Sequence, residues 1–269
     1  LARPEALHGL DRQSLLMIRP TLADDPMQPA MARAVAAGFP VVATVEALSP
    51  YPFAGEWALD AVDNAAWFAH RRGLRGFCLS LVDHADRSPL DSARVTLAYG
   101  VERMGSGPVQ PRSFLMEKYA RVNWQADAAD VAIACVQPPT LGRAAAGHQV
   151  ANLLTVLAAP EAWVYLNRTE NRDHVLREAQ ATFTRTQALI RKVNALAQGP
   201  HADDPALNHG RWLLRLNRHG ATKLLALHGA AEEYERAYAR FGDSRPLTGA
   251  APPEEVLEAL RRAETHCRA

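Results

Sequence analysis

The sequence predicts an α/β fold, with a mostly parallel sheet and flanking helices in the first half, followed by a helical C-terminal subdomain. Up to about residue 140, short apolar, β-branched runs alternate with helical patterns, as in βαβ units. Beyond that point nearly every segment has a helical pattern. We therefore expect an α/β layer over residues 1–140 and a mostly helical subdomain over 141–269, packed on it or continuous with it.

The first half contains four candidate strands and three helices between them. The strands are expected at 14–19, 41–47, 76–82 and 114–122. The helices are expected at 26–37, with Asp25 as its N-cap, 56–72 and 88–104, with Gly38 and Gly73 after the first two. The run 76–82 is almost wholly apolar, which is typical of a strand covered on both faces. We therefore expect helices on both faces of the sheet.

The second half has the pattern of a helical subdomain. Helices are expected at 141–157, 171–198, 205–216, 221–241 and 253–266, and a last strand at 162–166. Asp204 and Pro205 form a typical helix start, because aspartate caps the free backbone N–H groups and proline suits the first helical position. His219 and Gly220 resemble a helix end.

Composition excludes several classes of protein. The chain has 30 basic and 29 acidic residues and 48 % hydrophobic residues, which excludes a strongly basic nucleic-acid coat and a disordered chain. Its apolar runs are far shorter than the roughly 20 residues of a membrane span. Three scattered cysteines favour a reducing compartment, so we expect a cytoplasmic protein of bacterial type. We find no dinucleotide, phosphate-loop or metal-finger motif, and so predict no cofactor and no metal.

Polar residues at the predicted strand ends form the first candidate site. In parallel sheets, ligands bind beyond the carboxyl ends of the strands. There we place Asp83 or His84 as acid/base, Glu46 as a second carboxylate, and Arg19 and Arg121 as substrate anchors. The remaining residues assigned to substrate binding are Asn123 and Tyr51. These residues predict hydrolase- or lyase-like chemistry on a small polar or anionic substrate. A polar loop whose acids cap the helix starting at Ser88 is the simpler explanation of Asp83 and His84.

A basic stretch over 168–223 supports a different function. Arg211, Arg215 and Arg218 have the spacing of one helix face, and arginines on a helix are suited to phosphate contacts. The alternative prediction is therefore a nucleic-acid-binding or nucleoprotein-complex subunit. A solvated arginine face that covers apolar surface is the simpler explanation. A non-catalytic adaptor, possible homo-oligomer formation and the identity of the substrate all stay open.

Weaker candidates complete the sequence reading. Cys135 with His148 would give a Cys–His pair, and His228 with Glu232 has helical metal-ligand spacing; a buried thiol and a solvated ion pair are the favoured interpretations. Cys78 and Ser80 lie too far along their strand from His84 to form a dyad with it. Trp67 and Phe68 are expected in the core.

Overall fold

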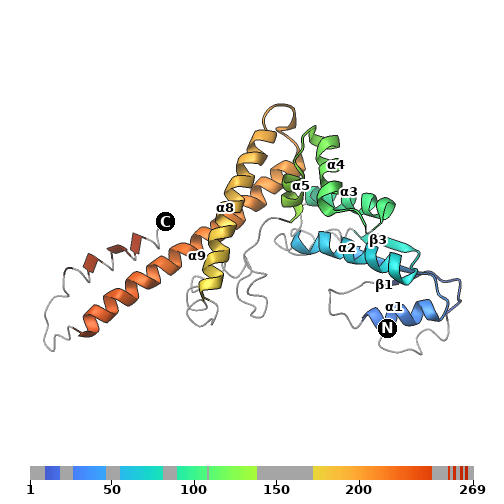
Figure 1. Cartoon of the computed structure of the whole chain (residues 1–269), viewed down its shortest axis with the longest axis horizontal. Helices are drawn as coiled ribbons and strands as arrows, with labels where there is room; N and C mark the ends of the chain where they lie inside the picture. Colours follow the sequence, from blue (N-terminus) through green and yellow to red (C-terminus); the bar gives the residue numbers. More distant parts are fainter. Residues whose placement is uncertain are drawn as a thin grey trace. The chain divides into compact units, whose positions relative to one another are not determined.

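The computed structural model describes residues 10–18, 27–46, 55–80, 90–107, 109–137 and 172–243, and seven positions between 254 and 265. Figure 1 shows the elements in this part of the chain. They divide into two compact units, which are described separately. The first comprises Leu1–Pro138 and Leu189–Leu214, and the second Pro139–Ala188 and Arg215–Ala269. The helices expected at 141–157 and the strand expected at 162–166 lie outside the described residues.

The first unit begins with a three-stranded parallel sheet. Its elements are β1 (Leu16–Ile18), α1 (Met27–Ala36), β2 (Val41–Glu46), α2 (Gly55–Arg72), β3 (Gly76–Ser80) and α3 (Leu90–Ser106). The strand order is β1-β2-β3, and both pairs are parallel. The three strands and three helices expected over this region are confirmed. Gly38 and Gly73 follow α1 and α2 with φ of 85° and 65°, a conformation that favours glycine at a helix end.

Among the described residues, helices cover only one face of this sheet. Val41 packs with Met31 of α1, and Ala43 and Val45, which share its face by strand alternation, pack with Leu59 of α2. Right-handed crossovers between strands that are adjacent in sequential order place their helices on the same side. The expectation of helices on both faces is therefore wrong for this part of the chain.

The opposite face of the sheet is less buried. Val42, Thr44, Cys78 and Ser80 are all half-buried, and Met17 is exposed. The expectation that β3 is covered on both faces is not met by these side chains. The three-stranded sheet is small, and the described chain is mainly helical.

One apolar run that was expected to extend the sheet is a helix. The predicted strand 114–122 lies inside α4 (Arg112–Trp124), and α5 (Ala129–Val136) follows it. In α4 the buried residues are Leu115, Met116, Ala120 and Trp124, which recur at helical spacing. The strand prediction is therefore wrong, since the apolar residues fit one helix face rather than the alternating sides of a strand.

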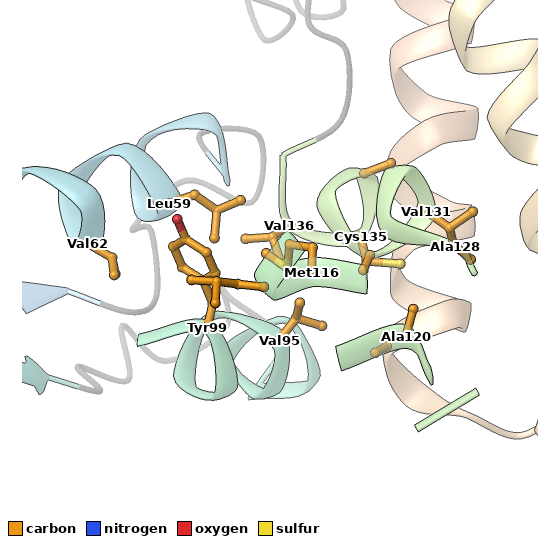
Figure 2. Packing of buried hydrophobic residues seen from close by; sticks show 14 of the residues in the cluster. Leu59, Val62, Val95, Tyr99, Met116, Ala120, Ala128, Val131, Cys135 and Val136 are labelled. Carbon is orange, nitrogen blue, oxygen red and sulfur yellow. The ribbon is translucent and has the colours of Figure 1, made fainter. Parts of the chain in front are cut away.

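These helices build the main core of the first unit. Buried side chains from β2, β3, α2, α3, α4 and α5 join one cluster. Figure 2 shows part of it, with the Tyr99 ring beside Leu59. The prediction that Trp67 belongs to the core is wrong, because its side chain is 41 % exposed. The buried residues of α2 are instead Leu59, Val62, Ala65 and Ala66.

The described chain continues with α8 (Arg172–Leu196), the short 3-10 helix η2 (Gly199–His201) and α9 (Pro205–Asp243). The Asp204 cap is confirmed, since its Oδ1 accepts a hydrogen bond from the backbone N–H of Leu207 at 2.9 Å. The helix end expected at His219–Gly220 is wrong: α9 continues through it, and Gly220 is buried. Glycine costs about 1 kcal/mol in a helix interior, which tertiary packing can offset.

Candidate functional site

The carboxyl ends of the three strands lie at one edge of the sheet. Parallel pairing aligns Ile18 with Ala43 and Glu46 with Ser80, so β2, between the other two strands, ends beside β3. Glu46 is described as the last residue of β2. Arg19, Tyr51, Asp83 and His84 lie outside the described residues, in the segments that follow the three strands.

This edge differs from the one expected for a doubly wound sheet. The described strands follow in sequential order, so they contain no reversal of strand order that would open a crevice. Sequential parallel strands still present their following loops at the carboxyl edge, which is where the (β/α)₈ barrels place their active sites. The edge therefore stays the candidate site.

The sheet face opposite Ala43 and Val45, next to this edge, carries polar groups: Thr44, which the sequence analysis did not consider, and Cys78 and Ser80, which it considered only as partners of His84. Thr44 pairs in register with Cys78, two residues before Glu46 pairs with Ser80. The Thr44 hydroxyl oxygen is buried and has no hydrogen-bond partner, which is costly for a polar group. Cys78 is half-exposed rather than buried. Strand alternation places Thr44, Cys78 and Ser80 on the face opposite Val45, so the sequence alone could have identified this group.

Arg121 and Asn123 do not lie at a strand end, because the segment that carries them is α4. Arg121 is exposed and forms ion pairs with Glu117 and with Asp127, the latter with an Nε–Oδ1 distance of 2.6 Å. The Asp127 hydrogen bond and charge, with Glu117, raise the pKa of Arg121. Asn123 donates a hydrogen bond to the Tyr119 carbonyl at 2.9 Å. Both residues were assigned to substrate binding because a strand was expected to end there, and that strand is a helix.

The most densely bonded polar cluster of the first unit joins α2, α3 and α4. Arg103 of α3 is only 4 % exposed. Its Nη2 lies 2.7 Å from Asp63 Oδ1 of α2, and its Nη1 donates to the Gly107 and Gln110 carbonyls at 3.3 and 2.5 Å. The Tyr99 hydroxyl donates to Asp63 and accepts from Arg103. Burial first, and then the Asp63 hydrogen bond, raise the pKa of Tyr99 to about 12.

Arg112, the first residue of α4, completes this cluster. It donates to Asp63 Oδ2 from Nε at 3.0 Å and from Nη2 at 2.6 Å, and its Nη2 also reaches Asp60 Oδ1 at 2.6 Å. Its Nη1 donates to Gln137 Oε1 at 2.8 Å. Burial alone would lower the pKa of Arg112, but the two carboxylates outweigh it and raise the pKa. Two arginines and two aspartates balance in charge, so the cluster acts as a clamp between helices.

The sequence reasoning missed this clamp. Its local signals are the i, i+3 pair Asp60–Asp63 and the i, i+4 pair Tyr99–Arg103, both of which place polar groups on one helix face. Neither pair identifies its partner, since Asp63 and Arg112 are 49 residues apart in sequence.

The alternative site lies on α9. Arg211, Arg215 and Arg218 fall on one side of this single helix, as their spacing predicts. Arg215 is exposed, and the other two are half-buried. Arg211 bonds to the Asn208 side chain. For Arg215 and Arg218 the guanidinium groups have no ion pair among the described residues.

The stretch of α9 that carries these arginines contains no acidic residue. No acidic residue occurs in the sequence between Asp204 and Glu232. Trp212 is 46 % exposed, and His219 is exposed as well. The sequence reasoning did not single out Trp212, although it follows Arg211 directly.

The weaker candidates have ordinary structural roles. Cys135 is buried, and Gly210 of α9 packs closely against it. Burial, with Asp204 adding to it, raises the pKa of this thiol well above its usual range, the opposite of what a nucleophilic thiolate requires. His148 lies outside the described residues. His228 forms an i, i+4 pair with Glu232 at 3.4 Å, and the described part of the chain shows no group of three or more side chains able to hold a metal ion.

Among the described residues, no helix combines the length and apolar character needed to cross a membrane.

Comparisons with known proteins assign no family to the chain. No family model matches the sequence, and neither the curated proteins nor the solved structures contain a significant match.

Proposed function

We propose that the chain is an enzyme that performs hydrolase- or lyase-like acid/base chemistry on a small polar or anionic substrate. The observation that carries the proposal is the parallel register, which ends β1, β2 and β3 at one edge and aligns Glu46 with Ser80. The segments leaving that edge contain Arg19, Tyr51 and the Asp83–His84 pair. These segments supply a carboxylate, an imidazole and a guanidinium, the groups that an enzyme needs to bind an anion and transfer protons.

Each residue has a distinct role in this proposal. Asp83 or His84 is the general acid/base, Glu46 is the second carboxylate, Arg19 anchors the substrate and Tyr51 contributes a wall. Thr44 and Ser80, on the sheet face opposite Ala43 and Val45, supply hydroxyl groups near the ends of β2 and β3. Arg121 and Asn123 take no part. The odd cysteine count supports a cytoplasmic location.

Turnover of p-nitrophenyl esters of carboxylic and phosphoric acids tests this function. The variants Glu46→Gln, Asp83→Asn and His84→Ala remove one group each. If an acid/base pair acts here, at least one of them lowers kcat about 100-fold or more. Glu102→Gln, which removes a surface carboxylate paired with Lys118, is the matched control and should leave kcat unchanged. Turnover that survives in all three site variants would overturn the proposal.

A second candidate function is nucleic-acid binding through α9. Two observations favour it. The guanidinium groups of Arg215 and Arg218 have no ion pair within the described chain, and the sequence from 205 to 231 contains no acidic residue. Elsewhere on the described surface, arginines such as Arg121, Arg236 and Arg262 do form ion pairs. Arginines without local acids remain available for phosphates.

Fluorescence anisotropy with labelled oligonucleotides, measured over a series of salt concentrations, tests this second function. The triple variant Arg211→Gln, Arg215→Gln, Arg218→Gln should weaken binding and reduce the log–log salt slope by about 2, since each phosphate contact contributes about 0.7 for single strands. The matched control replaces three ion-paired arginines, Arg121, Arg236 and Arg261, with glutamine. Equal losses in the two triple variants would show a nonspecific charge effect and contradict the assignment to α9.

A further inference from the structure

We propose that the solvent-facing side of α9 around Trp212 binds single-stranded nucleic acid, with one base stacked on the Trp212 indole and neighbouring phosphates on Arg211, Arg215 and Arg218. This inference rests on the nucleic-acid function proposed above, and it names the form of nucleic acid that the surface selects.

The first support is the position of Trp212 on the helix. Trp212, Arg215 and His219 follow at i, i+3 and i+7, so one face of α9 carries all three, and all three are exposed. The helix rise of 1.5 Å per residue spreads them over about 10 Å along the axis. An aromatic ring, a guanidinium and an imidazole therefore follow one another along one face of the helix.

The second support is the environment of the indole. Trp212 contacts the ring of His209, with centroids 5.9 Å apart and planes tilted by 34°. His209 is 9 % exposed, so a buried residue supports the exposed ring. The indole nevertheless keeps 46 % of its surface accessible, which leaves area for a planar ligand.

The third support is the match between this surface and the chemistry of a single strand. Exposed aromatic rings stack on unpaired bases, while basic side chains hold the backbone, and such binding tolerates any sequence. In a duplex the base faces are already stacked on each other and are not open to an indole. Because the sequence contains no acidic residue between Asp204 and Glu232, this stretch of α9 itself supplies no carboxylate that competes with phosphates for the arginines.

Anisotropy with a labelled oligothymidylate and with a duplex of equal length separates stacking from charge. Trp212→Ala should weaken binding of the oligothymidylate about tenfold, the scale found for loss of one stacked base, and leave the weaker duplex binding unchanged. Trp212→Phe should restore most of the affinity, because it keeps an aromatic face. Trp67→Ala, which removes the exposed tryptophan of α2, is the matched control and should bind like the unmodified protein.

The outcomes distinguish the inference from the function on which it rests. If Trp212→Ala binds both probes normally while the triple arginine variant loses them, stacking is overturned and nucleic-acid binding stands. If Trp212→Ala loses both probes equally, the indole has a structural role and the inference fails. If the unmodified protein binds neither probe at low salt, both proposals fail. If Trp212→Ala instead dissociates an oligomer in light scattering and binds oligothymidylate as before, the surface is a subunit contact and the inference is wrong.

Discussion

Replacing Asp63 with asparagine should destabilise the first unit, because this one carboxylate joins α2 to both α3 and α4. Asp63 faces Arg103 at 2.7 Å and accepts from Arg112 at 2.6 and 3.0 Å, and it also accepts from the Tyr99 hydroxyl. Asparagine keeps the shape but removes the charge that balances two guanidinium groups. Arg103, which is 4 % exposed, would then lose its one ion pair among the described residues.

The size of the effect follows from the burial of the partners. Breaking a fully buried ion pair costs about 3–5 kcal/mol. Asp63 and Arg112 are 28 % and 26 % exposed, so solvent screens part of that cost, and we expect about 2–3 kcal/mol for Asp63→Asn. The surface pair Glu102–Lys118 offers the comparison, because its side chains are 38 % and 53 % exposed. Glu102→Gln should cost no more than about 0.5 kcal/mol.

Urea unfolding followed by far-UV circular dichroism measures both variants. With a slope of about 3 kcal/mol per molar urea, the Asp63→Asn midpoint should fall by roughly 1 M, while the Glu102→Gln midpoint stays close to that of the unmodified protein. A midpoint shift for Asp63→Asn no larger than that for Glu102→Gln would refute the reasoning, since the clamp would then contribute no more than a surface pair.

Three further predictions concern packing and titration in the first unit. A Cβ at Gly210 would clash with Cys135 Sγ and lie 3.0 Å from Cys135 Cα, so Gly210→Ala should lower the free energy of unfolding by about 1–3 kcal/mol. A Cβ at Gly105 meets open space, so Gly105→Ala should leave the free energy of unfolding unchanged. Equal urea midpoints for the two variants would contradict this prediction. Burial and the Asp204 charge raise the pKa of Tyr119 to about 12, whereas an unfolded tyrosine ionises near pH 10. The free energy of unfolding should therefore fall as pH rises from about 10 through 12, and it should fall less steeply in Tyr119→Phe. Urea titrations that give both proteins the same alkaline slope would contradict this prediction. Burial raises the pKa of the Cys135 thiol, so this thiol should react with iodoacetamide only after unfolding, and later than the half-exposed Cys78. Mass spectrometry of labelled peptides measures both rates, and equal rates would disprove the burial of Cys135.

The comparison of the sequence predictions with the structure shows where local pattern is sufficient. The strand at Val41–Glu46 is rich in β-branched residues, and α9 begins at the predicted cap Asp204. Both features depend on residues within a few positions of each other. The stretch from Phe114 to Val122 misled the strand prediction because its apolar residues are interrupted by charged ones, so neither the strand period nor the helix period dominates locally. The continuous helix through Gly220 was missed for a related reason: glycine after histidine resembles a helix end until packing buries it.

The candidate site residues also depend on whether the element that carries them was predicted correctly. The sequence indicated the strand ends and the arginine spacing on α9, and the parallel register and helical course of the described chain support the placement of Glu46 and of Arg211, Arg215 and Arg218 on their elements. The roles of these residues stay proposals. Arg121 and Asn123 were assigned through a strand that does not exist, so one wrong element removed two site residues.

The sequence by itself determined which segments become the first three strands and most of the described helices, because hydrophobic periodicity, caps and glycine conformation act over a few residues. The tertiary structure alone decided the pairing order of the strands, the single helix-covered face of the sheet and the clamp of Asp63 with Arg103 and Arg112. Those features join groups tens of residues apart, and their energies come from burial and charge balance, which exist only once the helices have packed.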